Sequence, residues 1–207
     1  VGSEMCIRDR RYGVRPVIYY TNGFTTKVID GMGYPDRDVI SFHSMDDLER
    51  LIQKRGRAEI KDVTIKADIT DRPYQQTAIK RIVEWFNAKH RRGLLVLATG
   101  TGKTRVSISL CDILMRNDWV KNVLFLADRT ALVGQAHKNY EALLPSVSMS
   151  VLSEEKAPDM QARILFSTYQ TMINYLDRED KTFSVGRFDL IIIDEAHRSA
   201  VSYTHLT

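Results

Sequence analysis

Residues 94–104, LLVLATGTGKT, combine residue types that suit phosphate binding. The apolar run is expected to form a buried strand that ends in a glycine-containing turn, with a helix beginning at Lys103 and Thr104. Backbone N–H groups in such a turn converge on an anion, and the helix N-terminus adds a favourable dipole. Lys103 would then contact nucleotide phosphates, and the Thr104 hydroxyl would bind Mg²⁺. The strict pattern GxxxxGK[ST] requires glycine where this chain has Leu97, so the match is partial.

A second segment, FDLIIIDEAHRSA at residues 188–200, places two carboxylates after an apolar run. Asp194 would hold Mg²⁺ through water, and Glu195 would orient or deprotonate an attacking water. Alone, the segment has a second explanation, a strand followed by a helix that starts with an Asp-Glu pair. Because the phosphate-binding segment lies upstream in the same chain, the two together indicate hydrolysis of a nucleoside triphosphate.

The elements between these segments alternate between apolar strands and helices, which indicates an α/β fold with a parallel sheet covered by helices on both faces. A preceding helix is expected to open at Pro73 and to close at Gly93. Its apolar positions recur at helical spacing: Ala78, Ile79, Ile82, Val83 and Phe86. The later segments are LLVLA, KTRVSISLCDILMR, NVLFLA, TALVGQAHKNYEALL, ARILFST, YQTMINYL and FDLIIID.

Residues 15–55 have a different pattern, which predicts a β-hairpin followed by a helix. Asn22-Gly23 lies between two β-rich runs and is a strong hairpin signal. Ser44 is a candidate N-cap for a helix whose apolar residues share one face: Leu48, Leu51 and Ile52. This unit has too little apolar surface to be a domain, so it is expected to be the end of a preceding one.

Composition excludes several classes of protein. Thirty Lys and Arg against 26 Asp and Glu give a net charge of +4, which is too small to demonstrate a polyanionic partner. Two cysteines, Cys6 and Cys111, exclude a disulfide framework and a cysteine-based zinc site, and Cys111 is expected to be buried. The longest apolar runs are far shorter than a membrane span, which favours an intracellular protein without membrane contact.

The pair ATGTGKT and DEAH resembles the first RecA-like motor domain of superfamily 2 helicases and translocases. The resemblance implies ATP and Mg²⁺ as cofactors, with Lys103, Asp194 and Glu195 as catalytic residues. Thr104 and Asp194 would be the metal ligands, and His197 would have a coupling role. The nucleotide contacts that it implies are Gln75, at the adenine edge, and Thr99, Gly100, Thr101, Gly102, Lys103 and Thr104 in the loop.

Residues 127–135, ADRTALVGQ, and residues 167–172, STYQTM, are similar to motifs Ia and Ib of the same superfamily. In that family these motifs touch the nucleic-acid backbone, which makes Arg129, Gln135 and Thr168 candidate DNA contacts. Without the flanking motifs, the two segments would be interpreted as ordinary helix and strand-end residues.

Within the superfamily, residues 11–199 look most like the restriction (R) subunit of type I restriction-modification enzymes. This resemblance implies a prokaryotic cytoplasmic protein that moves along double-stranded DNA and assembles with methylation and specificity subunits. Two alternatives stay open: a nuclease-free superfamily 2 helicase acting on DNA or RNA, and a non-catalytic ATP-binding module. An upstream carboxylate–lysine nuclease motif in the full gene would favour the restriction subunit, and an ATPase assay would exclude the last alternative.

The expected organisation follows from this resemblance. The nuclease carboxylates and the second RecA-like domain are not in the sequence, so the chain alone is expected to be inactive. Residues 1–10 and 200–207 are interpreted as non-native tails, with short native tails as the alternative. The other units are the end of the nuclease domain at 11–57, a connector at 58–71 and an incomplete first RecA-like domain at 72–199.

Overall fold

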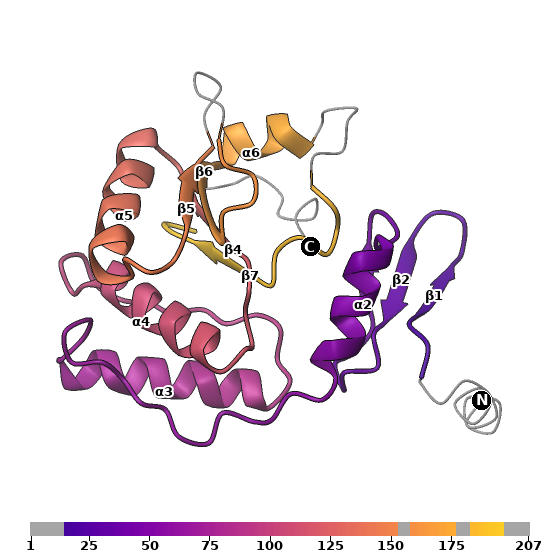
Figure 1. Ribbon diagram of the computed structural model, residues 1–207, viewed down its shortest axis with the longest axis horizontal. Helices are drawn as coiled ribbons and strands as arrows, with labels where there is room; N and C mark the ends of the chain where they lie inside the picture. The colour runs from indigo at the N-terminus through magenta and orange to yellow at the C-terminus, as the bar shows by residue number, and fades with distance from the viewer. Residues whose placement is uncertain (1–14, 153–157, 177–182, 197–207) are drawn as a thin grey trace.

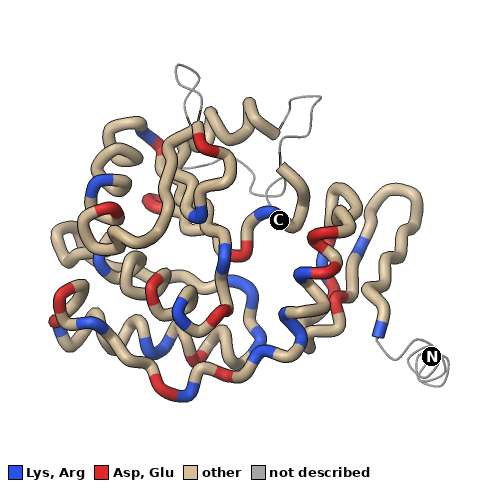
Figure 2. The backbone as a smooth tube through the Cα atoms, in the orientation of Figure 1, with Lys and Arg blue, Asp and Glu red and all other residues tan. Residues whose placement is uncertain are grey.

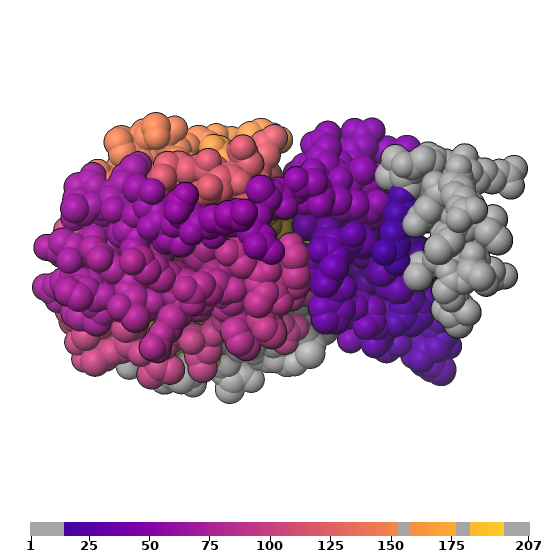
Figure 3. Space-filling model, turned by 90° about the horizontal axis from the view of Figure 1, so that it is seen from below, coloured from indigo at the N-terminus to yellow at the C-terminus, as the bar shows by residue number. Residues whose placement is uncertain are grey.

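The computed structural model describes residues 15–152, 158–176 and 183–196 of the chain. These residues form a three-stranded antiparallel sheet with the order β1-β2-β3 and a four-stranded parallel sheet with the order β5-β6-β4-β7 (Figure 1). The smaller unit lies beside the larger one, as the turned view also shows (Figure 3). The predicted α/β fold with a small preceding unit is therefore confirmed, whereas the predicted tails lie outside the described residues.

The N-terminal unit follows its local sequence signals. In the hairpin loop, the Asn22 side-chain oxygen accepts hydrogen bonds from the N–H groups of Phe24 (3.0 Å) and Thr25 (2.8 Å), while Gly23 has a φ of +92°. Thus the hairpin prediction is confirmed. The elements are β1 (Ile18–Thr21), β2 (Thr26–Ile29), β3 (Arg37–Val39) and α2 (Met45–Lys54).

Helix α2 begins at the predicted N-cap. The Ser44 hydroxyl accepts a hydrogen bond from the Asp47 N–H (3.2 Å), and the Asp47 carboxylate accepts one from the Ser44 N–H (3.3 Å). The two bonds form a capping box, which satisfies donors that the first turn leaves without helical partners. The buried residue of this helix is Asp47 rather than one of the three apolar residues, and Ile52 is exposed.

Helix α3 (Pro73–Asn87) begins at the predicted proline but ends before the predicted glycine. Lys89 takes the left-handed conformation (φ 65°), its N–H donates to the Phe86 carbonyl, and the His90 N–H donates to the Trp85 carbonyl. These bonds form a Schellman motif that closes the helix, with lysine in the position that glycine usually occupies. The prediction that Gly93 ends the helix was wrong.

The larger unit contains the predicted alternation of strands and helices, with one short strand, β5, that the sequence did not indicate. The elements are α4 (Lys103–Arg116), β4 (Val123–Ala127), α5 (Thr130–Leu143), β5 (Met149–Val151), β6 (Ile164–Thr168), α6 (Tyr169–Leu176) and β7 (Leu190–Ile193). None of the helices in the described part of the chain is both long and apolar enough to cross a bilayer.

The parallel sheet has an apolar core on each face. Along β4, Val123 and Phe125 pack into the cluster that holds the buried residues of α3, α4 and α5, whereas Leu124 and Leu126 pack into the other cluster, with α6. Successive residues of a strand point to opposite faces, so continuous burial along β4 requires cover on both sides. The prediction of helices on both faces is confirmed.

Residues 94–98 do not form the predicted strand. They have no regular secondary structure, and the side chains of Leu94 and Val96 are 78% and 86% exposed. A strand is stabilised by the ladder it shares with a neighbour, and in the described residues no strand pairs with this run. Its apolar composition alone therefore gave the wrong prediction.

Candidate functional site

The phosphate-loop segment, residues 98–104, turns sharply into helix α4. Gly100 and Gly102 have φ values of +77° and +85°, a conformation that glycine adopts without a Cβ penalty. The Thr101 hydroxyl donates to the Ala98 carbonyl (2.6 Å), which closes the turn. Helix α4 is buried along most of its length, so its N-terminus is held firmly behind the loop. This geometry is typical of an anion site at a helix N-terminus.

The Gln75 side chain of helix α3 binds the backbone of the phosphate loop. Its side chain is buried (1% exposed), its amide nitrogen donates to the Thr101 carbonyl (2.7 Å), and its amide oxygen accepts from the Thr70 hydroxyl. The Tyr74 hydroxyl also donates to the Thr101 carbonyl (2.9 Å). The adenine contact of Gln75 stays a prediction. Sequence reasoning missed Thr70 and Tyr74, although Tyr74 directly precedes Gln75 in the chain.

The two predicted carboxylates lie at the carboxyl end of β7. The Asp194 N–H donates to the Leu126 carbonyl of β4 (2.9 Å), and the Tyr169 hydroxyl donates to the Asp194 carbonyl (3.1 Å). Glu195 has a φ of 53°, which is uncommon outside glycine and is found most often where a site or turn over-determines the backbone. The backbone of Asp194 is therefore held by β4 and by Tyr169 of α6, and Glu195 follows it directly in the chain.

Burial is the largest influence on the pKa of Asp194, which is raised above its ordinary value. The N–H of Glu195 donates to the Asp194 carboxylate (3.0 Å) and opposes this effect, while the Glu195 carboxylate adds to it. A half-buried carboxylate of this kind is poorly solvated, so a cation placed beside it is strongly favoured.

The structure brings Lys103 and Glu195 together. The Lys103 amine lies 3.2 Å from a Glu195 carboxylate oxygen, and both side chains are partly buried. Consequently the first residue of α4 and the end of β7, which are 92 positions apart, form one site. Its elements are a glycine turn, a lysine, a helix N-terminus and two strand-end carboxylates, which together can hold an anion and a cation next to each other.

The residues at the site fit Mg²⁺ bound jointly by protein and nucleotide. Within the described residues, no group of three His, Cys, Asp or Glu side chains could hold a metal alone. Mg²⁺ usually keeps several waters and binds through one or two protein oxygens plus substrate phosphates. Thr104, in the first turn of α4, and Asp194 offer such a pair of hard oxygen donors.

Two of the three predicted DNA contacts, Arg129 and Thr168, lie at the same edge of the sheet, because the carboxyl ends of parallel strands lie together. Arg129 follows β4 with an exposed side chain, Gln135 is exposed on α5, and Thr168 ends β6. Thr168 is only 9% exposed, and its hydroxyl bonds to Thr171 in the first turn of α6. All three stay predictions, and His197 lies outside the described residues.

Charge does not single out a binding face. Basic and acidic residues are interspersed along the described backbone (Figure 2), in keeping with the small net charge. A polyanion would therefore have to be recognised by a local arrangement such as the strand-end loops rather than by a broad basic surface.

This fold and site define a P-loop nucleotide-binding protein of the α/β class. Residues 68–206 match the protein family "Type III restriction enzyme, res subunit", and the chain belongs to that family. Its curated relatives are endonuclease subunits of type I restriction enzymes, as the resemblance in the sequence predicted.

Two of these relatives come from Escherichia coli. The chain is 29% identical over 209 residues to the EcoKI endonuclease subunit of strain K12, covering 90% of this chain and 18% of the relative. It is 37% identical over 134 residues to the EcoAI endonuclease subunit, covering 63% of this chain and 16% of the relative. The chain thus spans less than a fifth of the length of these relatives.

Two solved structures are similar in fold. One is a fragment assigned to the HsdR subunit of a type I restriction enzyme from Vibrio vulnificus YJ016, with a TM-score of 0.51, 25% identity and coverage of 95% of this chain and 36% of that one. The other is a nuclease-deletion mutant of the Type ISP restriction-modification enzyme LlaGI with a DNA substrate mimic, with a TM-score of 0.52, 27% identity and coverage of 65% and 16%.

Proposed function

We propose that this chain is the nucleotide-binding part of an ATP-dependent motor that moves a type I restriction endonuclease along double-stranded DNA before cleavage. One observation carries the proposal, namely the meeting of Lys103 with Glu195 at the carboxyl edge of the parallel sheet. Family membership adds support, because the relatives are restriction endonuclease subunits and one structural neighbour was solved with a DNA substrate mimic.

In this proposal each residue of the site has a distinct role. The N–H groups of residues 99–104 and the Lys103 amine bind the β- and γ-phosphates of ATP, and Thr104 and Asp194 bind Mg²⁺, the latter through water. Glu195 orients the attacking water, for which it must first release Lys103 to the nucleotide. Arg129, Gln135 and Thr168 would contact the DNA backbone, and His197 would couple the two sites.

The proposal extends to the setting of the full-length protein. Methylation and specificity subunits would be its partners, and the prokaryotic cytoplasm would be its location. The second motor domain would supply positive charge to the γ-phosphoryl group, a contribution of about 10³ to 10⁵ in related enzymes. The 207-residue chain by itself is therefore expected neither to translocate nor to cleave DNA.

Lys103→Ala in the full-length protein tests the assignment. ATP-driven translocation, measured by displacement of a third strand from a DNA triplex, should be abolished, because the variant lacks the amine that binds the transferred phosphate. Lys138→Ala, at an exposed position of helix α5, is the matched control and should keep wild-type translocation. Full restriction activity in the Lys103 variant would refute the phosphate-loop assignment.

A further inference from the structure

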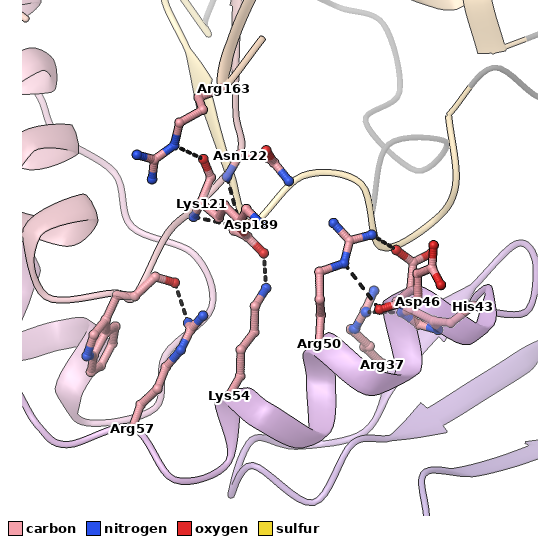
Figure 4. A network of polar contacts seen from close by, with 12 residues as sticks. Arg37, His43, Asp46, Arg50, Lys54, Arg57, Lys121, Asn122, Arg163 and Asp189 are labelled. Atoms are coloured by element: carbon pink, nitrogen blue, oxygen red, sulfur yellow. Dashed lines mark hydrogen bonds and ion pairs between the residues drawn. The ribbon is translucent and has the colours of Figure 1, made fainter. Parts of the chain in front are cut away.

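The last residue of helix α2 contacts the residue that precedes β7. Lys54 forms an ion pair with Asp189, and both side chains are largely buried (Figure 4). Asp189 follows Lys54 by 135 positions, so the contact joins the N-terminal unit to the larger one. It lies at the opposite end of β7 from Asp194.

Asp189 also joins the beginnings of two strands. Its second carboxylate oxygen accepts hydrogen bonds from the N–H groups of Lys121 (2.8 Å) and Asn122 (2.9 Å), directly before β4. The Asp189 N–H donates in turn to the Asn122 carbonyl (2.9 Å). The Asp189 carboxylate thus bonds both to Lys54 of α2 and to the start of β4. A movement of α2 would therefore affect the first residues of β4 and β7.

The first turn of α2 makes a second contact with the same segment. A Cβ atom at Gly186 would lie 2.5 Å from the Asp47 carboxyl carbon, so only glycine allows this approach. Asp47 is buried, and both Arg50 and the Ser184 hydroxyl bond to its carboxylate. We call Asp47, Lys54, Gly186 and Asp189 the α2–β7 junction.

Strand β7 connects this junction to the candidate site. Asp194 follows Asp189 by five positions, a length of about 16 Å for an extended strand. β7 is paired with β4 in parallel register from Leu190 to Ile193, and the ladder ends with the Asp194 N–H on the Leu126 carbonyl. One continuously hydrogen-bonded strand therefore joins Asp189 to the two carboxylates at its far end.

We propose that Lys54 is a positioning residue through which the N-terminal unit sets the placement of Asp194 and Glu195. The identity of the ligand, Mg²⁺ with nucleotide, rests on the proposed function. The structural link from Lys54 to β7 does not depend on it. A change in the N-terminal unit that withdraws Lys54 from Asp189 would then weaken Mg²⁺–nucleotide binding without touching the phosphate loop.

The test compares Lys54→Met and Lys54→Arg with the matched control Lys27→Met in the full-length protein. Lys27 belongs to the same unit and pairs with Asp36 (3.1 Å), but this ion pair is exposed to solvent and remote from β7. Two quantities are measured for each variant: amide hydrogen exchange of residues 183–196, and affinity for a fluorescent ATP analogue with and without Mg²⁺. Lys54→Gln replaces the methionine variant if the latter does not fold.

Lys54→Met should speed exchange in β7 and weaken the Mg²⁺-dependent affinity by about 5-fold or more, the low end of typical coupling between sites. Its Mg²⁺-free affinity should match wild type, because the loop at residues 99–104 is unchanged. Lys54→Arg should leave hydrogen exchange in β7 and the Mg²⁺-dependent affinity close to wild type, since arginine keeps the positive charge and is long enough to contact Asp189.

Exchange in β7 that is the same in Lys54→Met and Lys27→Met would overturn the inference. So would an equal loss of affinity with and without Mg²⁺, because that pattern indicates general destabilisation. If the wild-type protein binds no nucleotide, the proposed function fails, whereas faster exchange in β7 would still support the link from Lys54 to the strand.

Discussion

Lys103 and Glu195 neutralise each other across the candidate site, with 3.2 Å between the amine and a carboxylate oxygen. In the proposed function, the same lysine binds phosphate and the same glutamate faces the attacking water when nucleotide is present. The contact therefore competes with binding. Charge-assisted hydrogen bonds are about twice as strong as neutral ones. Loss of the contact between Lys103 and Glu195 should therefore change both the nucleotide affinity and the rate of hydrolysis.

Glu195→Gln should separate binding from hydrolysis. The amide cannot neutralise Lys103, so affinity for a fluorescent ATP analogue should equal or exceed that of the wild type. ATP hydrolysis by the full-length protein should fall by about 10²- to 10⁴-fold, the usual contribution of a general base. Glu141→Gln, at an exposed position of α5, should change neither quantity. Equal hydrolysis in both variants would exclude Glu195 from the reaction.

Gly102→Ala should destabilise the chain and weaken nucleotide binding. The residue has a φ of +85°, and an added Cβ would lie 2.5 Å from the Gln75 amide nitrogen, which is itself bonded to Thr101. Such strain costs about 1–3 kcal/mol. Gly134→Ala is the opposite control: it lies within helix α5, and its added Cβ meets nothing within 4 Å.

The control should therefore gain about 0.5–1 kcal/mol, because alanine is the better helix former. Urea unfolding followed by circular dichroism measures the free energy of unfolding of both variants. Equal shifts of the same sign would contradict the strained conformation of Gly102.

His43 should make the N-terminal unit sensitive to acid. Arg37 can only donate, so at 3.2 Å it fixes the Nε2 atom of His43 as an acceptor, and the Nδ1–H donates to the Tyr19 oxygen (2.5 Å). Burial, and then the charge of Arg37, lower the pKa of His43 below its ordinary value, while Asp47 and Asp30 oppose this and Lys54 adds to it. The folded chain therefore holds a neutral imidazole.

The unfolded chain binds a proton at His43 near pH 6.5, before the folded chain does, so the free energy of unfolding should fall as the pH drops below about 6.5. The loss should level off once the pH is below the lowered pKa of the folded state. His43→Gln should flatten this dependence in urea unfolding measured between pH 8 and pH 5. An unchanged slope in that variant would place the acid sensitivity elsewhere.

Cys111 should be inert in the folded chain. Burial raises the pKa of its thiol to about 12, and its sulfur lies 3.8 Å from the Tyr140 hydroxyl. The thiolate is the reactive form, so at pH 8 only about 10⁻⁴ of the thiol is reactive. A Cys6→Ser chain should resist a disulfide reagent until urea unfolds it, after which one thiol should react. Rapid labelling of the folded chain would contradict the burial of Cys111.

Local signals in the sequence predicted most elements of the fold. Asn22-Gly23, Ser44 and Pro73 lie where the structure begins or turns an element. Each acts on nearby backbone: Asn22 and Ser44 through side-chain hydrogen bonds, and Pro73 through its fixed φ. The prediction of a strand at residues 94–98 was wrong because a strand depends on pairing with a neighbour. The predicted end of α3 was wrong because Lys89 takes a backbone conformation that is usual for glycine. The three-residue strands β3 and β5 are too short to leave a pattern.

The candidate site was predictable for a different reason. The phosphate loop and the acids after β7 each have a recognisable residue pattern, and the two patterns were expected to form one site, as Lys103 and Glu195 do, although residues 94–98 do not form the strand that was expected before the loop. By contrast, Lys54 and Asp189 carry no motif. Their contact depends on how two units pack, and the sequence contained no signal for it.

The exposed apolar run at residues 94–96 leads directly into the phosphate loop. In concentrated solution such a run is a template for strand pairing between molecules, which favours aggregation. A ligand that binds only the native state withdraws chains from the aggregating population in proportion to its concentration. We therefore expect nucleotide to reduce aggregation during purification. The loop at residues 98–104, where we propose that it binds, begins just after the exposed apolar run.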